Sequence, residues 1–477
     1  MSDKQKYTAV IGLEVHVELK TETKIFCSCK TTFGAEPNTN VCPVCLGMPG
    51  ALPVLGKKQV ELAVRAGLAL GCKINRRSWF DRKNYFYPDL PKGYQITQFE
   101  KPICEGGAVP ITVNGENKTI RLNRIHMEED AGKLLHRDNE TLIDYNRAGV
   151  PLIEIVGEPD IRTSDEAKAY LTSLRRILSY IGVSDCKMNE GSLRCDVNVS
   201  VMPKGSRLYG IKCEIKNVNS INYVGRAIDD EIARQVSLLE KGVDIVPETR
   251  RFNEETGRCE KMRDKEKAVD YRYFTEPNIP PIILTDDYIN NVRKNMPLLP
   301  DEAMDELVRD YGMKQDDAYL VTSSRANTEY FKRAASLTEY KKEAANLFVS
   351  EILPNNEDGV EEYIPCAAFA EIAGLYGSGK VVSGNAKRLV HLVKERGESP
   401  LAIAENENML KITDEKVLTE LVSAAISENG KAVADYKNGK KNALKTILGA
   451  VMKKSHGAAD PIIAEKLIIK SADETVL

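Results

Sequence analysis

Long apolar runs are absent from this chain of 477 residues, and no stretch approaches the roughly 18 apolar residues that a membrane-spanning helix needs. An excess of one charge is also absent, because 67 Lys and Arg stand against 70 Asp and Glu, for a formal net charge of −3. This balance excludes a wholly basic nucleic-acid coat, although it allows a local basic patch. The N-terminal residues show neither a signal-peptide core nor an Arg- and Ser-rich transit helix. We therefore expect a cytoplasmic protein that makes no membrane contact.

Common nucleotide-binding and hydrolase motifs are missing as well. The sequence has no Walker A loop, no G-x-G-x-x-G fingerprint, no G-x-S-x-G elbow and no H-E-x-x-H motif. Only five histidines are present, and they form no obvious catalytic triad. Candidate functional residues must therefore come from other patterns.

Four of the eleven cysteines are clustered near the start of the chain. Cys27-x-Cys29 and Cys42-x-x-Cys45 are two thiol pairs separated by a 12-residue loop, a spacing that lets four thiolates converge on one tetrahedral ion. Zinc is the expected metal in a reducing compartment, and four bound thiolates leave no open position, which predicts a structural site. The alternative is a set of buried or redox-active cysteines. The seven scattered cysteines argue against a disulfide scaffold.

The chain changes character near Met296–Pro300. Before this point it is dense in short alternating segments, Gly, Pro and aromatic residues, and after it the pattern is almost entirely helical. A second break is predicted at Arg396–Pro400, where Gly and Pro interrupt two helical patterns. We predict an α+β fold class with three domains: residues 1–293 around a mainly antiparallel sheet, an all-α helical domain at 294–398, and a helical tail domain at 399–477.

Three segments of the first domain alternate with period two and predict strands: Tyr7–Leu19, Leu193–Val201 and Ile211–Ile215. A hairpin centred near Gly205 would place opposite each other residues whose numbers sum to about 410. Asp196 and Glu214 would then be cross-strand neighbours on a polar face.

Charged residues on one face of these strands suggest two alternatives. Glu14 and His16 in the first strand, with Asp196 and Glu214, could hold a hard cation such as Mg²⁺ or Mn²⁺. The acidic run His126–Asp130 could contribute to the same site. A solvated sheet face explains the pattern equally well.

Helical spacing of apolar residues predicts helices over Lys57–Gly71 and Ser164–Ile181, the second capped by Thr163 or Ser164. Phe80–Asp89 and Asp270–Phe274 interleave basic and aromatic residues, a pattern that can hold phosphates and stack on unpaired bases. An ordinary aromatic core edge is the alternative.

The C-terminal region is locally basic. Between Lys431 and Lys454 seven lysines stand against one acid, Asp435, for a local net charge of +6. An apolar stripe containing Ile447 and Val451 runs along the predicted helix, so the lysines should project from its other side and could contact a phosphate backbone. A solvated helix face is the alternative.

Several long motifs, in order across the chain, resemble the B-subunit family of the bacterial amidotransferases that act on Glu-tRNA(Gln) and Asp-tRNA(Asn). The segments that carry the resemblance are Ile11–Val17, Phe80–Asp89, His126–Lys133, Gly149–Glu154 and Asp270–Phe274. The resemblance implies a cradle-shaped catalytic domain with a zinc-binding insertion, a helical domain and a tRNA-binding tail.

The resemblance also implies an activity, which is that of an ATP-dependent carbon–nitrogen ligase in protein biosynthesis. The misacylated tRNA carries Glu or Asp, whose side-chain carboxylate is phosphorylated by ATP and then converted to the amide. The ammonia comes from glutamine through a glutaminase A subunit, and a small C subunit completes a heterotrimer. This chain has no recognisable glutaminase nucleophile arrangement, as expected if that activity lies in a partner.

Site residues follow from the resemblance by position. It implies Mg²⁺ ligation by a set of five residues, catalysis by Lys83 with Glu14 and His16, and ATP contacts from Arg194 and Ser192. The implied Mg²⁺ ligands are Glu14, His16, Glu129, Asp196 and Glu214; alternation places Glu129 in phase with Met127, which leaves its side of the sheet open. The implied tRNA contacts are Lys440, Lys441, Lys445, Lys453 and Lys454.

Two different functions remain as alternatives. A non-catalytic zinc-containing tRNA-binding protein would have a merely solvated acidic face. A metal-dependent phosphohydrolase would hydrolyse ATP or phosphoesters without tRNA or partners. Neither alternative explains the ordered set of motifs.

Overall fold

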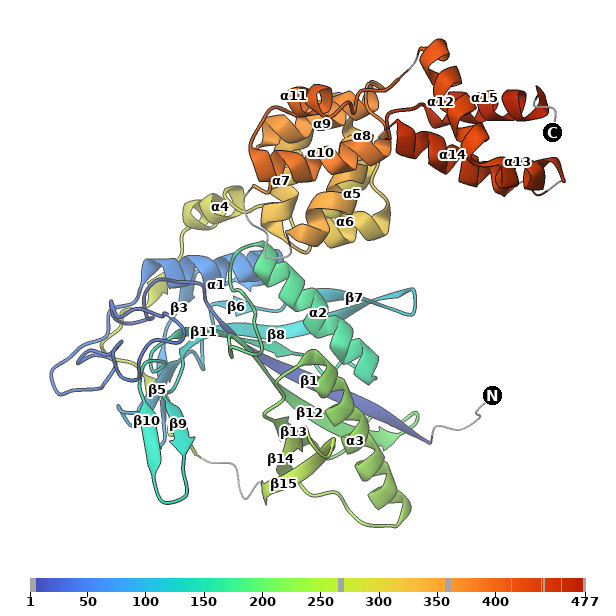
Figure 1. Cartoon of the computed structure of the whole chain (residues 1–477). Helices are drawn as coiled ribbons and strands as arrows, with labels where there is room; N and C mark the ends of the chain where they lie inside the picture. The colour runs from blue at the N-terminus through green and yellow to red at the C-terminus, as the bar shows by residue number, and fades with distance from the viewer. Residues whose placement is uncertain are drawn as a thin grey trace. The chain divides into compact units, whose positions relative to one another are not determined.

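The computed structural model describes residues 6–264, 270–356, 362–412, 414–438, 440, 442–455 and 457–474. The chain divides into two compact units, Met1–Leu299 and Pro300–Leu477. The first is built on a large sheet with helices and the second is helical, which confirms the predicted α+β class (Figure 1). Among the described residues, no helix has the length and apolar character needed to cross a bilayer.

The first unit is organised around β1 (Tyr7–Glu18), which lies between β12 (Leu193–Pro203) and β11 (Pro151–Gly157). Both pairings are antiparallel, and the sheet continues through β8 (Glu116–Glu129) on one side and β13 (Cys213–Lys216) on the other. Only the junction between β13 and β14 (Glu248–Asn253) is parallel among the described strand pairs. The mainly antiparallel sheet predicted from alternation is therefore confirmed.

The remaining elements of the first unit are short strands and one further helix. They are β2 (Lys73–Ile74), β3 (Arg77–Ser78), β4 (Asp81–Asn84), β5 (Tyr94–Thr97), β6 (Cys104–Glu105), β7 (Ala108–Val113), β9 (Lys133–His136), β10 (Thr141–Asp144), β15 (Arg258–Asp264), β16 (Phe274–Thr275), β17 (Ile282–Ile283) and α4 (Asp286–Lys294).

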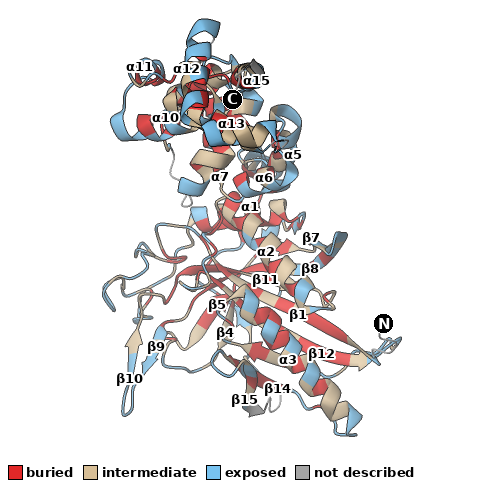
Figure 2. Ribbon diagram, turned by 45° about the vertical axis from the view of Figure 1, so that its right-hand side comes forward, coloured by how far each residue is buried: buried red, intermediate tan, exposed pale blue. Residues whose placement is uncertain are grey.

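One face of the sheet forms the hydrophobic core with three helices, α1 (Lys57–Ala69), α2 (Ser164–Tyr180) and α3 (Ile221–Glu240). Side chains such as Leu13 and Val15 of β1 point to this face and are at most 1% exposed. Figure 2 shows the buried colour running along β1 and the inner sides of the helices. The helix predictions are confirmed, and α2 begins after Thr163, whose hydroxyl accepts a hydrogen bond from the Glu166 N–H.

The predicted hairpin between β12 and β13 has a different register. Glu214 lies opposite Asn198, so paired residue numbers sum to 412 and not to about 410. Asp196 and Glu214 are consequently diagonal neighbours. An offset of two residues keeps every side chain on its face, because side chains alternate along a strand with period two.

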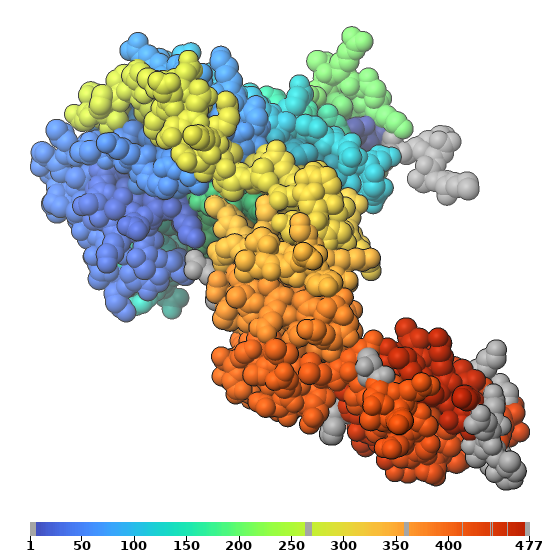
Figure 3. Space-filling view, turned by 90° about the horizontal axis from the view of Figure 1, so that it is seen from above, coloured from blue at the N-terminus to red at the C-terminus, as the bar shows by residue number. Residues whose placement is uncertain are grey.

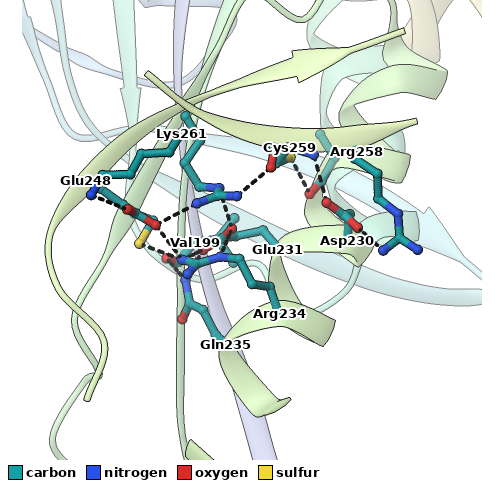
Figure 4. A network of polar contacts seen from close by, with 12 residues as sticks. Val199, Asp230, Glu231, Arg234, Gln235, Glu248, Arg258, Cys259 and Lys261 are labelled. Carbon is teal, nitrogen blue, oxygen red and sulfur yellow. Dashed lines mark hydrogen bonds and ion pairs between the residues drawn. The ribbon is translucent and has the colours of Figure 1, made fainter. Parts of the chain in front are cut away.

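A buried ionic network ties α3 to β14 and β15 on the helix-covered side of the sheet (Figure 4). Glu231 is fully buried and accepts hydrogen bonds from Arg234 at 2.7 Å and Gln235 at 2.6 Å. Arg234 and Arg250 also reach Glu248, at 3.0 and 2.7 Å. The two guanidiniums therefore neutralise the two carboxylates in a place that water does not solvate.

The substitution Glu231→Gln tests this network. It leaves the charge of Arg250 and Arg234 only partly compensated in a buried place, and we expect the free energy of unfolding to fall by about 3–5 kcal/mol. Urea unfolding followed by the fluorescence of Trp79, the single tryptophan, measures it within the same unit. The control Glu260→Gln disrupts an exposed pair with Arg251 and should unfold as the wild type does. Equal stability of all three proteins would contradict the assignment.

The second unit contains two separate hydrophobic clusters. Its helical elements are α5 (Pro300–Tyr311), α6 (Gln315–Val321), α7 (Arg325–Ala335), α8 (Lys341–Leu347), a π turn (Phe348–Ile352), a 3-10 turn (Leu353–Asn355), α9 (Cys366–Gly377), α10 (Ser383–Arg396), α11 (Pro400–Asn406), α12 (Glu415–Glu428), α13 (Gly430–Lys437), α14 (Ala443–Lys454) and α15 (Pro461–Glu474). The predicted break occurs at Gly397, which ends α10 with a φ of 68°.

The boundary between the two hydrophobic clusters along the chain does not coincide with the break in the helices at Gly397. Ile403 of α11 and Met409 are buried in the first cluster, and the second cluster begins with Leu418. The helical pattern is thus interrupted near residue 397, but the chain continues to pack into the first cluster as far as Met409. The three-domain division at 293 and 398 stays a prediction.

Candidate functional site

The face of the sheet turned away from α1, α2 and α3 carries a charged cluster drawn from neighbouring strands. His16 of β1 has Nδ1 3.0 Å from Glu128 of β8 and 3.9 Å from Glu154 of β11. His126 of β8 lies beside them, with Nε2 3.3 Å from Glu154. Ligand atoms of His16, Glu128 and Glu154 lie within 4.8 Å of one another, a spacing compatible with one metal ion. The register of β1 with β11 places His16 opposite Glu154 and so brings the cluster together.

The pKa values within this cluster reflect mutual stabilisation. Burial alone would lower the pKa of His16, but the hydrogen bond and charge of Glu128, with the charges of Glu154 and Asp196, raise it to about 9. Burial would raise the pKa of Glu154, but His126, His16 and Lys83 lower it to about 2. His16 is therefore an imidazolium held between carboxylates.

Glu14 and Asp196 are directly opposite each other on the same face. Burial, together with the charges of Glu154 and Asp196, raises the pKa of Glu14, whose carboxylate accepts a hydrogen bond from Asn198 at 3.0 Å. Lys216 of β13 lies between the other two acids, with Nζ 2.5 Å from Asp196 and 3.0 Å from Glu214. The Lys216 ammonium thus offsets the negative charge of Asp196 and Glu214, the two acids that the sequence predicted to be neighbours.

Glu129 does not join the other four residues that the family resemblance implied. It is 2% exposed and points to the other side of β8, where it contacts Lys92 at 2.7 Å and accepts from the Ile96 N–H at 2.9 Å. Its neighbour Glu128 occupies the charged face. Met127, which is in phase with Glu129, is fully buried in the core, so the structure settles the side of the strand that the sequence left open.

Sequence reasoning did not single out Glu128, Glu154 and His126 as individual ligands. The available signal was the period-two spacing of His126 and Glu128, which puts both on one face of a strand. Glu154 follows in the same way from the strand Pro151–Gly157, but only the pairing of β8 with β11 shows that it meets His126.

Lys83 lies at the edge of the cluster among aromatic rings. Its Nζ is 4.9 Å from the ring centre of Tyr271 and 5.9 Å from that of Tyr85. Tyr273 continues the aromatic wall by stacking on Phe99 with ring centres 4.2 Å apart. Among the described residues, Lys83 has no carboxylate within ion-pair distance, which leaves its charge available to an anion. The two basic-aromatic segments of the sequence thus form one surface.

Arg194 and Ser192 are engaged within the protein. The Arg194 guanidinium donates to Asp130 at 2.6 Å and lies opposite His16 in the register of β1 with β12. The Ser192 hydroxyl donates to Asp185 and accepts from the Lys187 N–H at 2.8 Å. Arg194 borders the charged face, whereas Ser192 stabilises the loop that precedes β12.

The structure brings together the four clustered cysteines, Cys27, Cys29, Cys42 and Cys45, whose Sγ atoms lie within 4.8 Å of one another. The Sγ atoms of Cys42 and Cys45 are 3.9 Å apart, close to the spacing of about 3.8 Å that follows from tetrahedral Zn–S bonds of about 2.3 Å. The donor set and its spacing therefore fit zinc.

Further polar groups surround the thiols. A hydrogen bond from Cys27, the Cys42 N–H and the charge of Lys24 lower the pKa of Cys45 to about 4, against the effect of burial. Lys24 is 1% exposed, and its Nζ lies 3.6 Å from the Cys45 sulfur. A buried ammonium beside a thiolate partly offsets the negative charge of four such ligands.

The predicted basic helix of the tail is α14. Ile447 and Val451 are buried and form the apolar stripe, while Lys445 and Lys453 are exposed. Lys440 pairs with Asp435 at 3.0 Å and Lys454 with Glu428 at 2.6 Å. Lys441 lies outside the described residues.

Comparison with known proteins gives consistent results for both units. A family model described as the GatB/GatE catalytic domain matches residues 9–290, and one described as the GatB domain matches residues 329–471. The B subunit of the aspartyl/glutamyl-tRNA(Asn/Gln) amidotransferase of Thermoanaerobacter pseudethanolicus is 50% identical over 468 residues, which cover 97% of this chain and 98% of the relative. The protein of the same description from Caldicellulosiruptor saccharolyticus is 49% identical over 472 residues, with coverages of 97% and 98%.

A third relative of the same description, from Persephonella marina, is 46% identical over 468 residues, 97% of this chain and 99% of the relative. Identity at this level over nearly the whole chain confirms the family indicated by the ordered motifs. The chain belongs to the family of aspartyl/glutamyl-tRNA(Asn/Gln) amidotransferase B subunits.

Proposed function

We propose that this chain activates and amidates the side-chain carboxylate of Glu-tRNA(Gln), of Asp-tRNA(Asn), or of both, using ATP. The observation that carries the proposal is the charged face formed by His16, Glu128 and Glu154 in a chain that belongs to this family. The reaction makes it an ATP-dependent carbon–nitrogen ligase of protein biosynthesis.

The chemistry requires a leaving group, because a carboxylate cannot expel oxide. A carboxylate oxygen of the aminoacyl group attacks the γ-phosphorus of ATP and ADP leaves, which gives an acyl phosphate. Ammonia then attacks the acyl carbon, phosphate leaves with the electron pair of the broken C–O bond, and a proton is lost from nitrogen. Lys83 stabilises the charge on the transferred phosphoryl group, since its ammonium meets aromatic rings and no carboxylate.

A divalent cation fits the acidic face. We propose that Glu14, His16, Glu128, Asp196 and Glu214 surround it, with Glu128 in place of Glu129. Mg²⁺ bound there would neutralise phosphate charge. Binding through His16 requires loss of the proton that its carboxylate neighbours now stabilise, so the oxygen donors are the main ligands. Arg194 at the border of this face is a proposed ATP contact, and Ser192 supports it from the adjoining loop.

The family to which the chain belongs supports the proposed partners. Ammonia in bulk water is mostly protonated and unreactive as a nucleophile, so a glutaminase A subunit must deliver it from glutamine through a closed path. A small C subunit completes the proposed heterotrimer in the cytoplasm, and the misacylated tRNA binds partly through the tail lysines.

The paired substitutions Glu128→Gln and Glu129→Gln test the active face. Removing the charge of Glu128 should lower ATP-dependent phosphorylation of Glu-tRNA(Gln) by about 10²-fold or more in the complete complex. Glu129→Gln changes a neighbour on the other side of the strand and should retain phosphorylation. The glutaminase rate of the partner, measured separately, reports whether the complex is intact. Undiminished phosphorylation in Glu128→Gln would exclude the metal assignment, whereas tRNA binding without any ATP turnover in the wild type would favour a non-catalytic tRNA-binding protein.

The zinc assignment predicts metal content. We expect about one zinc per chain in the wild type and almost none in Cys42→Ser/Cys45→Ser, with a lower melting temperature, because bound metal stabilises the fold around it. Cys366→Ser, at a half-buried thiol in the second unit, is the matched control and should keep its zinc. Elemental analysis by mass spectrometry measures the content. Equal zinc in all three proteins would disprove the site.

The tail assignment predicts weaker tRNA binding on charge reversal. Lys445→Glu/Lys453→Glu changes the two exposed lysines of α14 and should raise the Kd for tRNA about tenfold at moderate salt, with a shallower salt dependence. Lys314→Glu/Lys380→Glu, an equal charge change elsewhere in the second unit, is the control. Filter binding at several salt concentrations gives both quantities. Identical affinity in the two variants would count against a contact at α14.

A further inference from the structure

A basic pocket lies at the edge of the first unit, on elements that contribute nothing to the charged face described above. It encloses about 710 Å³. Its walls come from the end of α1, from β2 and β3, from the loop before β6, and from α4. In Figure 3 the yellow segment that includes α4 lies against blue residues from the N-terminal part of the chain. This agrees with the packing of α4 on α1. The lining residues are Leu68, Cys72, Lys73, Ile74, Asn75, Arg76, Arg77, Trp79, Lys101, Ile289 and Arg293.

Five of these lining residues are cationic and none is acidic. Two have counter-charges nearby, because Arg76 pairs with Asp286 and Lys73 lies 3.8 Å from Glu105. Arg293 stands in the last turn of α4, where a cation also offsets the helix dipole.

For Arg77 and Lys101, neither a nearby carboxylate nor a helix end within the described part of the chain offsets the positive charge. Both are exposed, and neither has a carboxylate within ion-pair distance among the described residues. They come from different segments, β3 and the loop before β6, and line one concave site. Like charges brought together without counter-charges raise the local affinity for an anion.

The shape and chemistry of the pocket favour a compact ligand of high negative charge. Guanidinium groups bind phosphate oxygens through paired hydrogen bonds, and ammonium groups add point charge. A concave site of this volume suits a small molecule, because ligand pockets commonly measure about 300–1,000 Å³. The indole of Trp79 supplies an aromatic wall beside the cations. Several cations in one pocket favour a ligand that carries more than one phosphate group.

We propose that this pocket binds a polyphosphate of the kind carried by a nucleoside triphosphate, at a site separate from the carboxylate face. The site goes beyond the proposed reaction, because it contains no residue of the His16, Glu128 and Glu154 cluster. Bound phosphate would neutralise Arg77 and Lys101 together and join β3 to the loop that carries Lys101.

Trp79 provides a direct probe, because it is the single tryptophan of the chain and lines the pocket. Its emission in the full-length chain is titrated with inorganic tripolyphosphate, with ATP and with tRNA, and with sodium sulfate at matched ionic strength. We expect a saturable change with tripolyphosphate and with ATP. In Arg77→Gln/Lys101→Gln the apparent Kd should rise at least tenfold. Lys204→Gln/Lys241→Gln, which removes two exposed cations elsewhere in the same unit, should titrate as the wild type does.

The proposal would be overturned by the absence of a saturable change with tripolyphosphate, by an equal change in Arg77→Gln/Lys101→Gln, or by an equal response to sulfate at the same ionic strength. A response to tRNA alone would also overturn it and would assign the pocket to RNA. The titration involves no turnover, so its failure leaves the proposed amidation untouched, and loss of phosphorylation in Glu128→Gln leaves the pocket untouched.

Discussion

The antiparallel register of β1 with β11 and β12 is the constraint on which the first unit depends. Within twelve residues it sends Leu13 and Val15 into the core and Glu14 and His16 to the opposite face. A shift of one residue would exchange the two sets and place charges among the packed helices. The pairing that closes the hydrophobic core is therefore the same pairing that assembles the charged face.

The acidic groups of that face are tolerable because neighbouring strands supply cations. The His16 imidazolium contacts Glu128 and Glu154, and the Lys216 ammonium contacts two further acids, Asp196 and Glu214. An isolated half-buried carboxylate would be costly, and these contacts remove most of that cost. Lys83 lies at the border of this face against the ring of Tyr271, and among the described residues it has no carboxylate within ion-pair distance.

The two sides of the sheet use charge differently. On the helix-covered side, ion pairs among Glu231, Arg234, Glu248 and Arg250 join α3 to β14. On the open side the charges are partly exposed, and Lys83 at its border has no carboxylate within ion-pair distance among the described residues. The pocket beside Trp79 is a third arrangement, in which cations gather without acids in its lining.

Alternation and helical spacing depend only on local geometry, so the sequence predicted the strand Tyr7–Glu18 and the helices α1 and α2 with their inward faces. The spacing of the four cysteines likewise predicted that their thiols converge. The short strands and α3 carried no such signal. Which acids meet depends on strand pairing: the register puts Glu214 opposite Asn198, and the pairing of β8 with β11 brings Glu154 to His126. Contacts between distant strands depend on the length and path of the loops that join them, which residue periodicity does not encode.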